Sequence, residues 1–288
     1  RYSYCGKTSV LPDSLGKLIK MYKVPVVVFI QHGNYLSQPQ WNLKKRRCRL
    51  EATMTRVLTP EQIKQAGVEE INQTIKDAFQ YDEYRWQKDN NIVIDFPDRA
   101  KGLHHILYQC PHCLTESEMN SGRDELWCEH CHKRWRMSEL GELSAIEGET
   151  EFSHIPDWFE FEREMVRKQI EEGAYFFQDR VIVDSLPNAR GFIRLGEGML
   201  THTLDGFVLE IVRDGKIFRL EKKSLSLYSL HIEFDYFKKG DCLDLSTLDD
   251  TFYIYPLTRK NVVTKLQFAV EEIYKIKEME SMAGNRKK

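Results

Sequence analysis

Two Cys-x-x-Cys pairs constrain this chain more than any other feature of its sequence. The first is Cys110-Pro-His-Cys113, and the second, Cys128-Glu-His-Cys131, follows after fourteen intervening residues. Two tight knuckles at this spacing can bring four thiolates to the corners of a tetrahedron, which is the geometry and the soft ligand set that zinc favours. We therefore predict a structural zinc ribbon; the alternatives are disulfides or free thiols. Because four cysteines leave no open coordination position, the zinc is expected to stabilise the fold and not to catalyse a reaction.

Length and composition favour a globular protein of two or three domains. The chain has 288 residues, of which 41% are hydrophobic and 30% are charged, as in soluble proteins with cores of their own. Its net charge of −2 gives no overall attraction to nucleic acid. Cys5, Cys48 and Cys242 are scattered, which favours a reducing cytosol over a secreted disulfide framework. No apolar run reaches the ~20 residues of a membrane span.

The first hundred residues have an α/β pattern. Apolar residues at helical spacing predict a helix over Ser14–Tyr22. The run Val24–Ile30 is apolar on both faces, as in a buried central strand, and alternation predicts a second strand over Leu50–Leu58. Thr59-Pro60 has the residue types of a helix start, and one longer helix is predicted over Val68–Trp86.

The second half of the chain changes from helical to strand patterns. An amphipathic helix is predicted from Pro156 to near Gly173. Asp214-Gly215 is a hairpin signal between two of the predicted strands, and a last helix contains Leu266 and Ile276. This order suggests a small barrel or curved sheet capped by one helix, as in pleckstrin-homology-like domains. The predicted strands are Val181–Asp184, Gly191–Leu195, Phe207–Arg213, Ile217–Glu221, Tyr228–Phe234 and Thr251–Tyr255.

The opening residues resemble a known enzyme family. Arg1-Tyr-Ser-Tyr-Cys-Gly6, then a short helix and the strand that contains Pro25, resemble part of the lysophosphatidate acyltransferases. That family has a Pro-Glu-Gly-Thr-Arg-Ser block, a helix and a Pro-Val-x-Pro strand; a bacterial subgroup with a zinc ribbon has Pro-Glu-Ala-Arg-Tyr-Ser instead. Only the first proline of the strand motif is present here. Further segments similar to this subgroup are Leu11–Lys17, Gly33–Leu36, Pro39–Trp41 and Phe152–Trp158.

The resemblance implies transfer of an acyl chain from acyl-CoA or acyl carrier protein to lysophosphatidate or a similar glycerol phosphate in phospholipid synthesis. In the family, the histidine of His-x-x-x-x-Asp removes the proton of the acceptor hydroxyl. None of the nine histidines here has aspartate five positions later, so we expect no catalytic residue in this chain and a missing N-terminal part that carries the base. Arg1 and Ser3 would bind substrate, since a guanidinium suits the acceptor phosphate; a solvated Arg1 is the alternative.

Basic residues are concentrated in Lys44-Lys-Arg-Arg-Cys-Arg49. Lys44, Lys45, Arg46, Arg47 and Arg49 would suit an anionic membrane surface, with about 1 kcal/mol for each cation near the surface; the alternative is a solvated turn. The predicted ribbon, from Lys101 to Leu140, has five basic and six acidic side chains, so nucleic acid is not an expected partner. These features favour a cytoplasmic protein that is peripheral at the inner face of the cell membrane.

The sequence therefore predicts an α+β chain with four parts. Residues 1–100 would be the C-terminal part of an acyltransferase domain and residues 101–140 the zinc ribbon. A helical connector over 141–175 would lead to a β-rich accessory domain over 176–288 with a C-terminal helix. The rival hypothesis is a non-enzymatic zinc-ribbon adaptor that binds a protein or lipid partner. His154 and Asp157, which could be imagined as a catalytic pair, are better explained by a capping turn before a helix.

Overall fold

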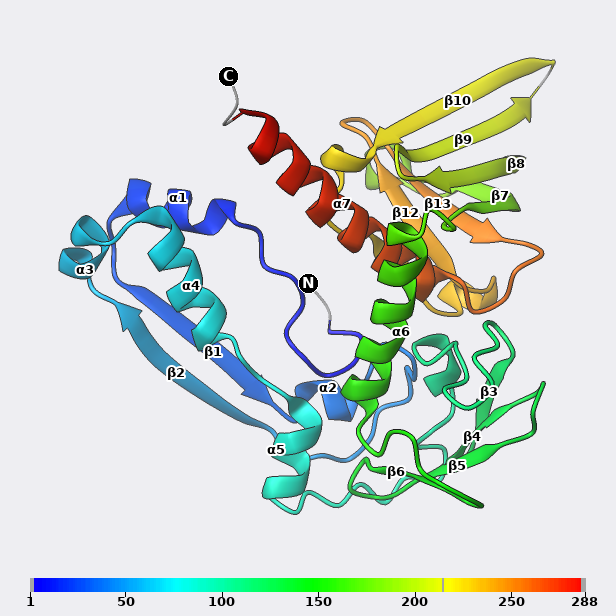
Figure 1. The fold of residues 1–288 in the computed structure, drawn as a ribbon, viewed down its shortest axis with the longest axis horizontal. Helices are drawn as coiled ribbons and strands as arrows, with labels where there is room; N and C mark the ends of the chain where they lie inside the picture. The colour runs from blue at the N-terminus through cyan, green and yellow to red at the C-terminus, as the bar shows by residue number, and fades with distance from the viewer. Residues whose placement is uncertain (1–2, 214, 286–288) are drawn as a thin grey trace. The chain divides into compact units, whose positions relative to one another are not determined.

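The chain is a mixed α+β protein, and its computed structural model describes residues 3–213 and 215–285 (Figure 1). This part of the chain contains seven α-helices and thirteen strands in three sheets. It divides into two compact units, which are described separately. Unit 1 comprises residues 1–101, 122–125 and 135–156, and unit 2 comprises residues 102–121, 126–134 and 157–288.

Unit 1 is built around a two-stranded antiparallel ribbon of β1 (Val26–His32) and β2 (Glu51–Leu58). Ile63 and Ile71, from two of its helices, are fully buried in the core beside Leu58. Thr59 begins α3 with a capping box, because its side chain accepts from the Gln62 N–H while Gln62 bonds back to the Thr59 N–H. The helices are α1 (Ser14–Tyr22), α2 (Asn34–Ser37), α3 (Pro60–Gln65), α4 (Val68–Ala78) and α5 (Glu83–Asp89).

Two predictions for this unit differ from the structure. The strand over Val24–Ile30 was expected to be buried on both faces, but Val27 and Phe29 of β1 are about half exposed, at 49% and 48%. The long helix over Val68–Trp86 is broken into α4 and α5, because Asp82 caps a new helix by accepting from two backbone N–H groups. The predicted helix over Ser14–Tyr22 is confirmed.

A four-stranded sheet follows, with strand order β3-β4-β5-β6. Its short strands alternate between buried and more exposed side chains, and the buried ones include Leu126 and Leu143. Its residues belong to both units, and the cysteine pairs lie in the part that belongs to unit 2. The strands are β3 (Met119–Gly122), β4 (Glu125–Cys128), β5 (Arg134–Met137) and β6 (Leu143–Ala145).

Unit 2 contains the large sheet, whose seven antiparallel strands have the order β10-β9-β8-β7-β13-β12-β11. Helix α7 (Val263–Asn285) contacts β11, and its Phe268 packs edge-on against Phe159 of α6 (Ile155–Glu171) at 4.6 Å between ring centres. The strands are β7 (Phe177–Ser185), β8 (Ile193–Thr203), β9 (Gly206–Arg213), β10 (Lys216–Lys223), β11 (His231–Glu233), β12 (Cys242–Ser246) and β13 (Thr251–Pro256).

Strands followed by one helix are therefore present, as the sequence predicts, but with three corrections. The predicted strand over Gly191–Leu195 is the start of a longer strand, β8, which begins at Ile193 and continues to Thr203. The predicted strand over Tyr228–Phe234 shortens to β11, since chain turns flank His231–Glu233 on both sides. The strand β12 was missed, although Leu243 and Leu245, both fully buried, show the alternation of a half-buried strand. Asp214, the first residue of the predicted hairpin turn, lies outside the described residues.

Candidate metal centre

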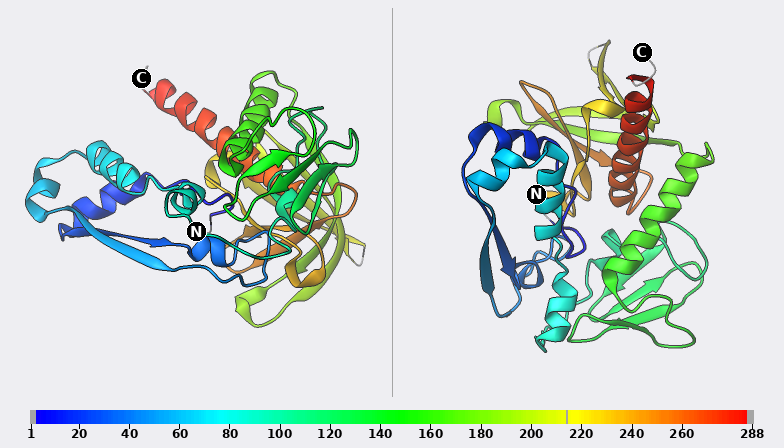
Figure 2. Two further views of the ribbon diagram at one scale, coloured as in Figure 1. Left: turned by 90° about the horizontal axis from the view of Figure 1, so that it is seen from below. Right: turned by 60° about the vertical axis from the view of Figure 1, so that its left-hand side comes forward.

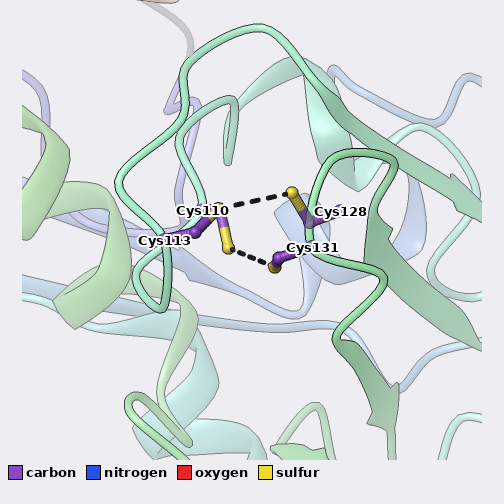
Figure 3. Close-up of side chains that lie close together, drawn as sticks. All are labelled: Cys110, Cys113, Cys128 and Cys131. Atoms are coloured by element: carbon purple, nitrogen blue, oxygen red, sulfur yellow. Dashed lines mark hydrogen bonds between the residues drawn. The ribbon is translucent and has the colours of Figure 1, made fainter.

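The two cysteine pairs come together in the structure, as the sequence predicts (Figure 3). The sulfur of Cys110 lies 3.7 Å from that of Cys131, and the sulfur of Cys113 lies 3.8 Å from that of Cys128. All four sulfur atoms lie within 4.8 Å of one another. A tetrahedral site with Zn–S bonds of about 2.3 Å separates its ligand atoms by about 3.8 Å. The four cysteines thus have the spacing of a zinc site and could hold the ion.

Each pair lies on a turn of the same construction. The N–H of Leu114 donates to the carbonyl of Cys110 at 2.9 Å, and the N–H of Cys110 donates to the carbonyl of Thr115 at 3.0 Å. Leu114 closes the turn in the left-handed region, with φ of 64°. The second turn repeats both bonds at Cys128, and its left-handed residue is His132, with φ of 62°. Because the same two hydrogen bonds close both turns, both pairs have the same spacing of two residues between their cysteines.

The protonation of the thiols follows from their surroundings. Cys110 and Cys128 are fully buried, and burial raises the pKa of both thiols. Burial acts in the same direction on Cys113, but its hydrogen bonds with the side chain and the backbone of Thr115 outweigh burial and hold the pKa of Cys113 at about 6. A bound dication would displace the remaining thiol protons, so metal affinity should rise with pH. With four thiolates the centre is closed, which suits a structural ion.

The residue before the first ligand is anchored from helix α6. The N–H of Gln109 donates to the carboxyl of Glu162 at 2.8 Å, and its carbonyl accepts from the indole of Trp158 at 2.9 Å. Both α6 side chains are fully buried, and burial raises the pKa of Glu162 well above its usual range. The position of Cys110 is therefore fixed from outside its own turn, because contacts to the residues around metal ligands help to orient the ligands.

The two residues expected to bind substrate are not gathered into a described site. Arg1 lies outside the described residues. Ser3 is half-buried, and its hydroxyl donates to the carbonyl of Lys7 at 2.6 Å. Gly6 follows in the left-handed region, with φ of 83°, where a Cβ would contact Tyr35 at 3.2 Å. The Ser3 hydroxyl thus closes a turn to Lys7, and Gly6 lies inside this turn.

The basic run does not form one continuous surface. Arg46 is buried, at 6% exposed, and its guanidinium lies over the ring of Trp41 at 4.9 Å and donates to the carbonyl of Arg99. Lys44 pairs with Asp98 at 2.9 Å. The interpretation of Arg46 as a membrane contact is therefore wrong, because a stacked and desolvated guanidinium cannot reach a lipid headgroup. The exposed cations of the run are Lys44, Lys45, Arg47 and Arg49.

Sequence reasoning missed a hydrogen-bonded pair that the fold brings together. The imidazole of His154 lies 2.8 Å from the carboxylate of Asp82, seventy-two residues away, and both side chains are largely buried. Burial acts to raise the pKa of Asp82, but bonds to His154 and to the start of α5 outweigh it and lower that pKa. His154 precedes α6, as the predicted capping turn requires, and it pairs with Asp82. No local pattern could have revealed this partner.

In comparisons with known proteins, no family model, no curated protein and no solved structure matches the chain. Of the helices in the described ranges, none is both long and apolar enough to span a membrane. The geometry of the four cysteines is thus the strongest functional observation that the structure provides.

Proposed function

We propose that this chain is part of a lysophospholipid acyltransferase of the bacterial type that has a zinc ribbon. The complete enzyme would transfer an acyl chain from a thioester donor to lysophosphatidate or a similar glycerol phosphate. The proposal rests on one observation, the order of elements at the start of the chain. The Arg1–Gly6 segment is followed by the helix α1 and then by the strand β1 directly after Pro25, which is the order that the resemblance implies.

The ribbon and the β-rich sheet would be accessory parts of this enzyme. They supply no base, because no histidine in the sequence stands five positions before an aspartate. The four-cysteine centre would hold the ribbon folded. Zinc supplies structural stability in such a site and leaves the acyl transfer to residues outside this chain.

The test compares the 288-residue chain with a longer natural protein in which it occurs, whose sequence is first searched for His-x-x-x-x-Asp. We expect the longer protein to acylate lysophosphatidate from an acyl thioester and the 288-residue chain to be inactive. Replacing the histidine of the motif should lower kcat by at least about 10²-fold, the usual contribution of a general base. A longer protein that lacks the motif, or that has it and leaves lysophosphatidate unmodified, would contradict the proposal.

A peripheral contact with an anionic membrane would bring such an enzyme to its lipid acceptor. The cations available for it are Lys45, Arg47 and Arg49, which are exposed; Lys44 and Arg46 have partners within unit 1. Arg49 also pairs with Glu51, so its contribution is expected to be the smallest of the three. At about 1 kcal/mol for each cation, this surface adds to membrane affinity but does not anchor the protein alone.

Replacing Lys45, Arg47 and Arg49 with glutamine should weaken sedimentation with phosphatidylserine vesicles by about 10- to 100-fold. The matched control replaces Lys64, Lys168 and Lys216, three exposed lysines elsewhere on the chain. Equal vesicle binding by both triple variants would contradict the membrane contact and favour the alternative, in which the basic run is a solvated turn.

The alternative is a zinc-ribbon adaptor without enzymatic activity. It is favoured by the placement of all four zinc-site cysteines in the same compact unit as the seven-stranded sheet. An ion pair of 2.6 Å between Lys265 of α7 and Glu116, near the first cysteine pair, connects the elements that carry the cysteines with α7. The longer protein's activity separates the two hypotheses, since an adaptor needs no His-x-x-x-x-Asp motif.

A further inference from the structure

One face of the seven-stranded sheet carries a row of polar and charged side chains. Helix α7 lies along the other face of the sheet (Figure 2), and the cross-strand neighbours Ile232, Leu243 and Ile254 are fully buried beneath it. Successive residues of a strand point to opposite faces, so the residues next to these three lie on the face away from α7. The polar row there crosses five strands and consists of His231, Asp244, Tyr253, Asp184 and Arg194.

The two aspartates of this row are both buried but differ in their partners. Asp184 is 2% exposed; it lies 2.8 Å from the ammonium of Lys239 and also pairs with Arg194. The side chain of Asp244 is 10% exposed, and its Oδ1 has no hydrogen-bond partner among the described residues. The imidazole of His231 lies 3.9 Å from its other oxygen, which is too far for a hydrogen bond. Because buried polar atoms are normally paired, Oδ1 of Asp244 requires a donor.

Lys239 shows which kind of donor this face of the sheet accepts. Its ammonium donates to Asp184 and lies over the rings of Phe192, at 5.4 Å, and Tyr255, at 5.9 Å. A carboxylate together with aromatic faces stabilises a cation that has lost part of its hydration. The sheet thus already holds one ammonium group in this way, at the first of its two aspartates.

The same two features meet at the second aspartate. Tyr253 is the direct cross-strand neighbour of Asp244, and the ring of Tyr236 stacks on that of Tyr253 at 5.3 Å, with 5° between the ring planes. Phe192 packs edge-on against Tyr253 at 5.1 Å. Burial raises the pKa of Tyr236, and the carboxylates of Glu233 and Asp244 raise it further. The negative charge at this end of the aromatic cluster therefore favours a cation beside these rings.

The segment that carries Tyr236 has a strained backbone. Asp235, Phe237 and Lys238 all lie in the left-handed region, with φ of 43°, 50° and 61°. Residues other than glycine adopt this conformation at a cost in free energy, and such residues concentrate at ligand clamps. Phe237 is 65% exposed, so the aromatic cluster reaches solvent at this segment. A small opening of the segment relieves the strain and gives a ligand access to Asp244.

We propose that this face of the sheet binds a primary ammonium group, which donates to Oδ1 of Asp244 and lies against the rings of Tyr236 and Tyr253. A quaternary ammonium fits less well, because it has no N–H to donate to the carboxylate. A metal ion also fits less well, since the described histidines and carboxylates form no cluster of metal ligands here. The ammonium belongs to a small amine or to the ethanolamine headgroup of a lipid, which present the same chemistry.

Titration of the 288-residue chain with ethanolamine tests the inference, with tetramethylammonium as the matched probe. We expect ethanolamine to shift the NMR signals of the Tyr236 and Tyr253 rings. Tetramethylammonium should bind at least about 10-fold more weakly, because it lacks the charge-assisted hydrogen bond to Asp244. Unshifted tyrosine signals in ethanolamine, or equal affinity for the two cations, would overturn the inference.

The affinity for ethanolamine should rise with pH. Burial raises the pKa of Asp244 to about 7; Glu233 acts in the same direction, and His231 opposes them. An ammonium binds the ionised carboxylate, whose fraction rises from about 10% at pH 6 to about 90% at pH 8, so the affinity should rise about 10-fold over this range. Protonation of His231 at low pH adds a positive charge and acts in the same direction. The titratable groups that act on Asp244 come from β11, β12, β13 and the segment 235–241; they are His231, Glu233, Cys242, Tyr253 and Tyr236.

Asp244→Asn should weaken ethanolamine binding at least about 10-fold and remove its pH dependence between pH 6 and pH 8. The matched control is Asp249→Asn, which changes an exposed carboxylate between β12 and β13 and should leave binding unchanged. A folded Asp244→Asn chain that binds ethanolamine as tightly as wild type would overturn the inference. If Asp244→Asn does not fold, the pH dependence of the wild-type chain decides, and an affinity that is equal at pH 6 and pH 8 would overturn the inference.

Competition with lipid separates the two sources of the ammonium. Vesicles that contain phosphatidylethanolamine displace ethanolamine from the chain if the ligand is a lipid headgroup, whereas phosphatidylcholine vesicles, which carry a quaternary ammonium, do not. No displacement by either vesicle identifies the ligand as a free amine. Both results support the ammonium site, and equal displacement by the two kinds of vesicle would overturn it.

Discussion

Replacing Cys128 with serine should remove the zinc and unfold the region around the two knuckles, roughly residues 104–137. The purified wild-type chain should contain one equivalent of zinc, measured by mass spectrometry of the metal content. Structural zinc contributes about 10–16 kcal/mol of binding free energy in isolated zinc-finger peptides. The small sheet beside the knuckles has strands of only three or four residues, so its own contacts cannot replace a stabilising free energy of that size. Loss of one ligand should therefore unfold the ribbon before the rest of the chain.

The matched control is Cys48→Ser, which changes a half-buried cysteine that belongs to no cluster of metal ligands among the described residues. This variant should keep its zinc and its slow exchange over residues 104–137. Hydrogen exchange of Cys128→Ser that stays as slow as wild type would show that the metal is not structural. A zinc content near zero in the wild-type chain would contradict the assignment of a zinc centre.

Unfolding should spread from the knuckles into α6 only in part. Gln109 is held by Glu162 and Trp158, both fully buried, so the zinc loop and this helix share hydrogen bonds. The core of unit 2 has further support from the edge-on contact between the rings of Phe159 and Phe268. Exchange should therefore rise most at residues 104–137, less in α6 and least in α7.

The features that could be predicted from the sequence are the local ones. The spacing of Cys110 to Cys113 fixes a turn, and Thr59 caps the helix that directly follows it. Both depend on atoms within five residues of each other. The metal centre needed one further assumption, that two similar turns meet, and the matching spacing of Cys128 to Cys131 supplied it.

The features that could not be predicted depend on partners distant in sequence. Arg46 sits in a run of cations that looks solvated, yet Trp41 and Arg99 bury it. His154 finds Asp82 across seventy-two residues. In each case, segments that are distant in the sequence bury a polar group. No local sequence pattern predicts these contacts, because they follow from the packing of the whole unit.

Replacing Arg163 with methionine should destabilise unit 2 by about 3–5 kcal/mol, which for a unit of this size lowers Tm by on the order of 10 °C. The guanidinium lies 2.6 Å from Glu271 and 3.4 Å from Glu272, and it stacks over Phe268 at 4.5 Å. Both glutamate side chains are only 3% exposed. Methionine fills much of the same volume, but it leaves two buried carboxylates without the cation between them.

Arg167→Met is the matched control, one helical turn further along α6. Arg167 bonds Glu272 at 2.8 Å, but it is 34% exposed, and Lys275 still pairs with Glu272 at 2.7 Å when Arg167 is gone. Its loss should cost no more than about 1 kcal/mol. Thermal or denaturant unfolding measures the destabilisation by each substitution. Equal destabilisation would show that the burial of Arg163 does not increase its contribution to stability.

The pH dependence of the Arg163 variant should separate lost charge pairing from lost packing. Burial acts to raise the pKa of Glu272, but Arg167, Lys275 and Arg163 outweigh it and hold that pKa below its ordinary value. A carboxylate whose pKa is lowered by folding contributes stability above the unfolded pKa of about 4.3, and this contribution is lost as the pH falls through the folded pKa. Without Arg163 the folded pKa of Glu272 rises, so the difference in unfolding free energy from wild type should be largest near pH 7 and shrink below about pH 4. A difference that stays constant from pH 7 to pH 3 would instead assign the loss to the stacking of Arg163 on Phe268.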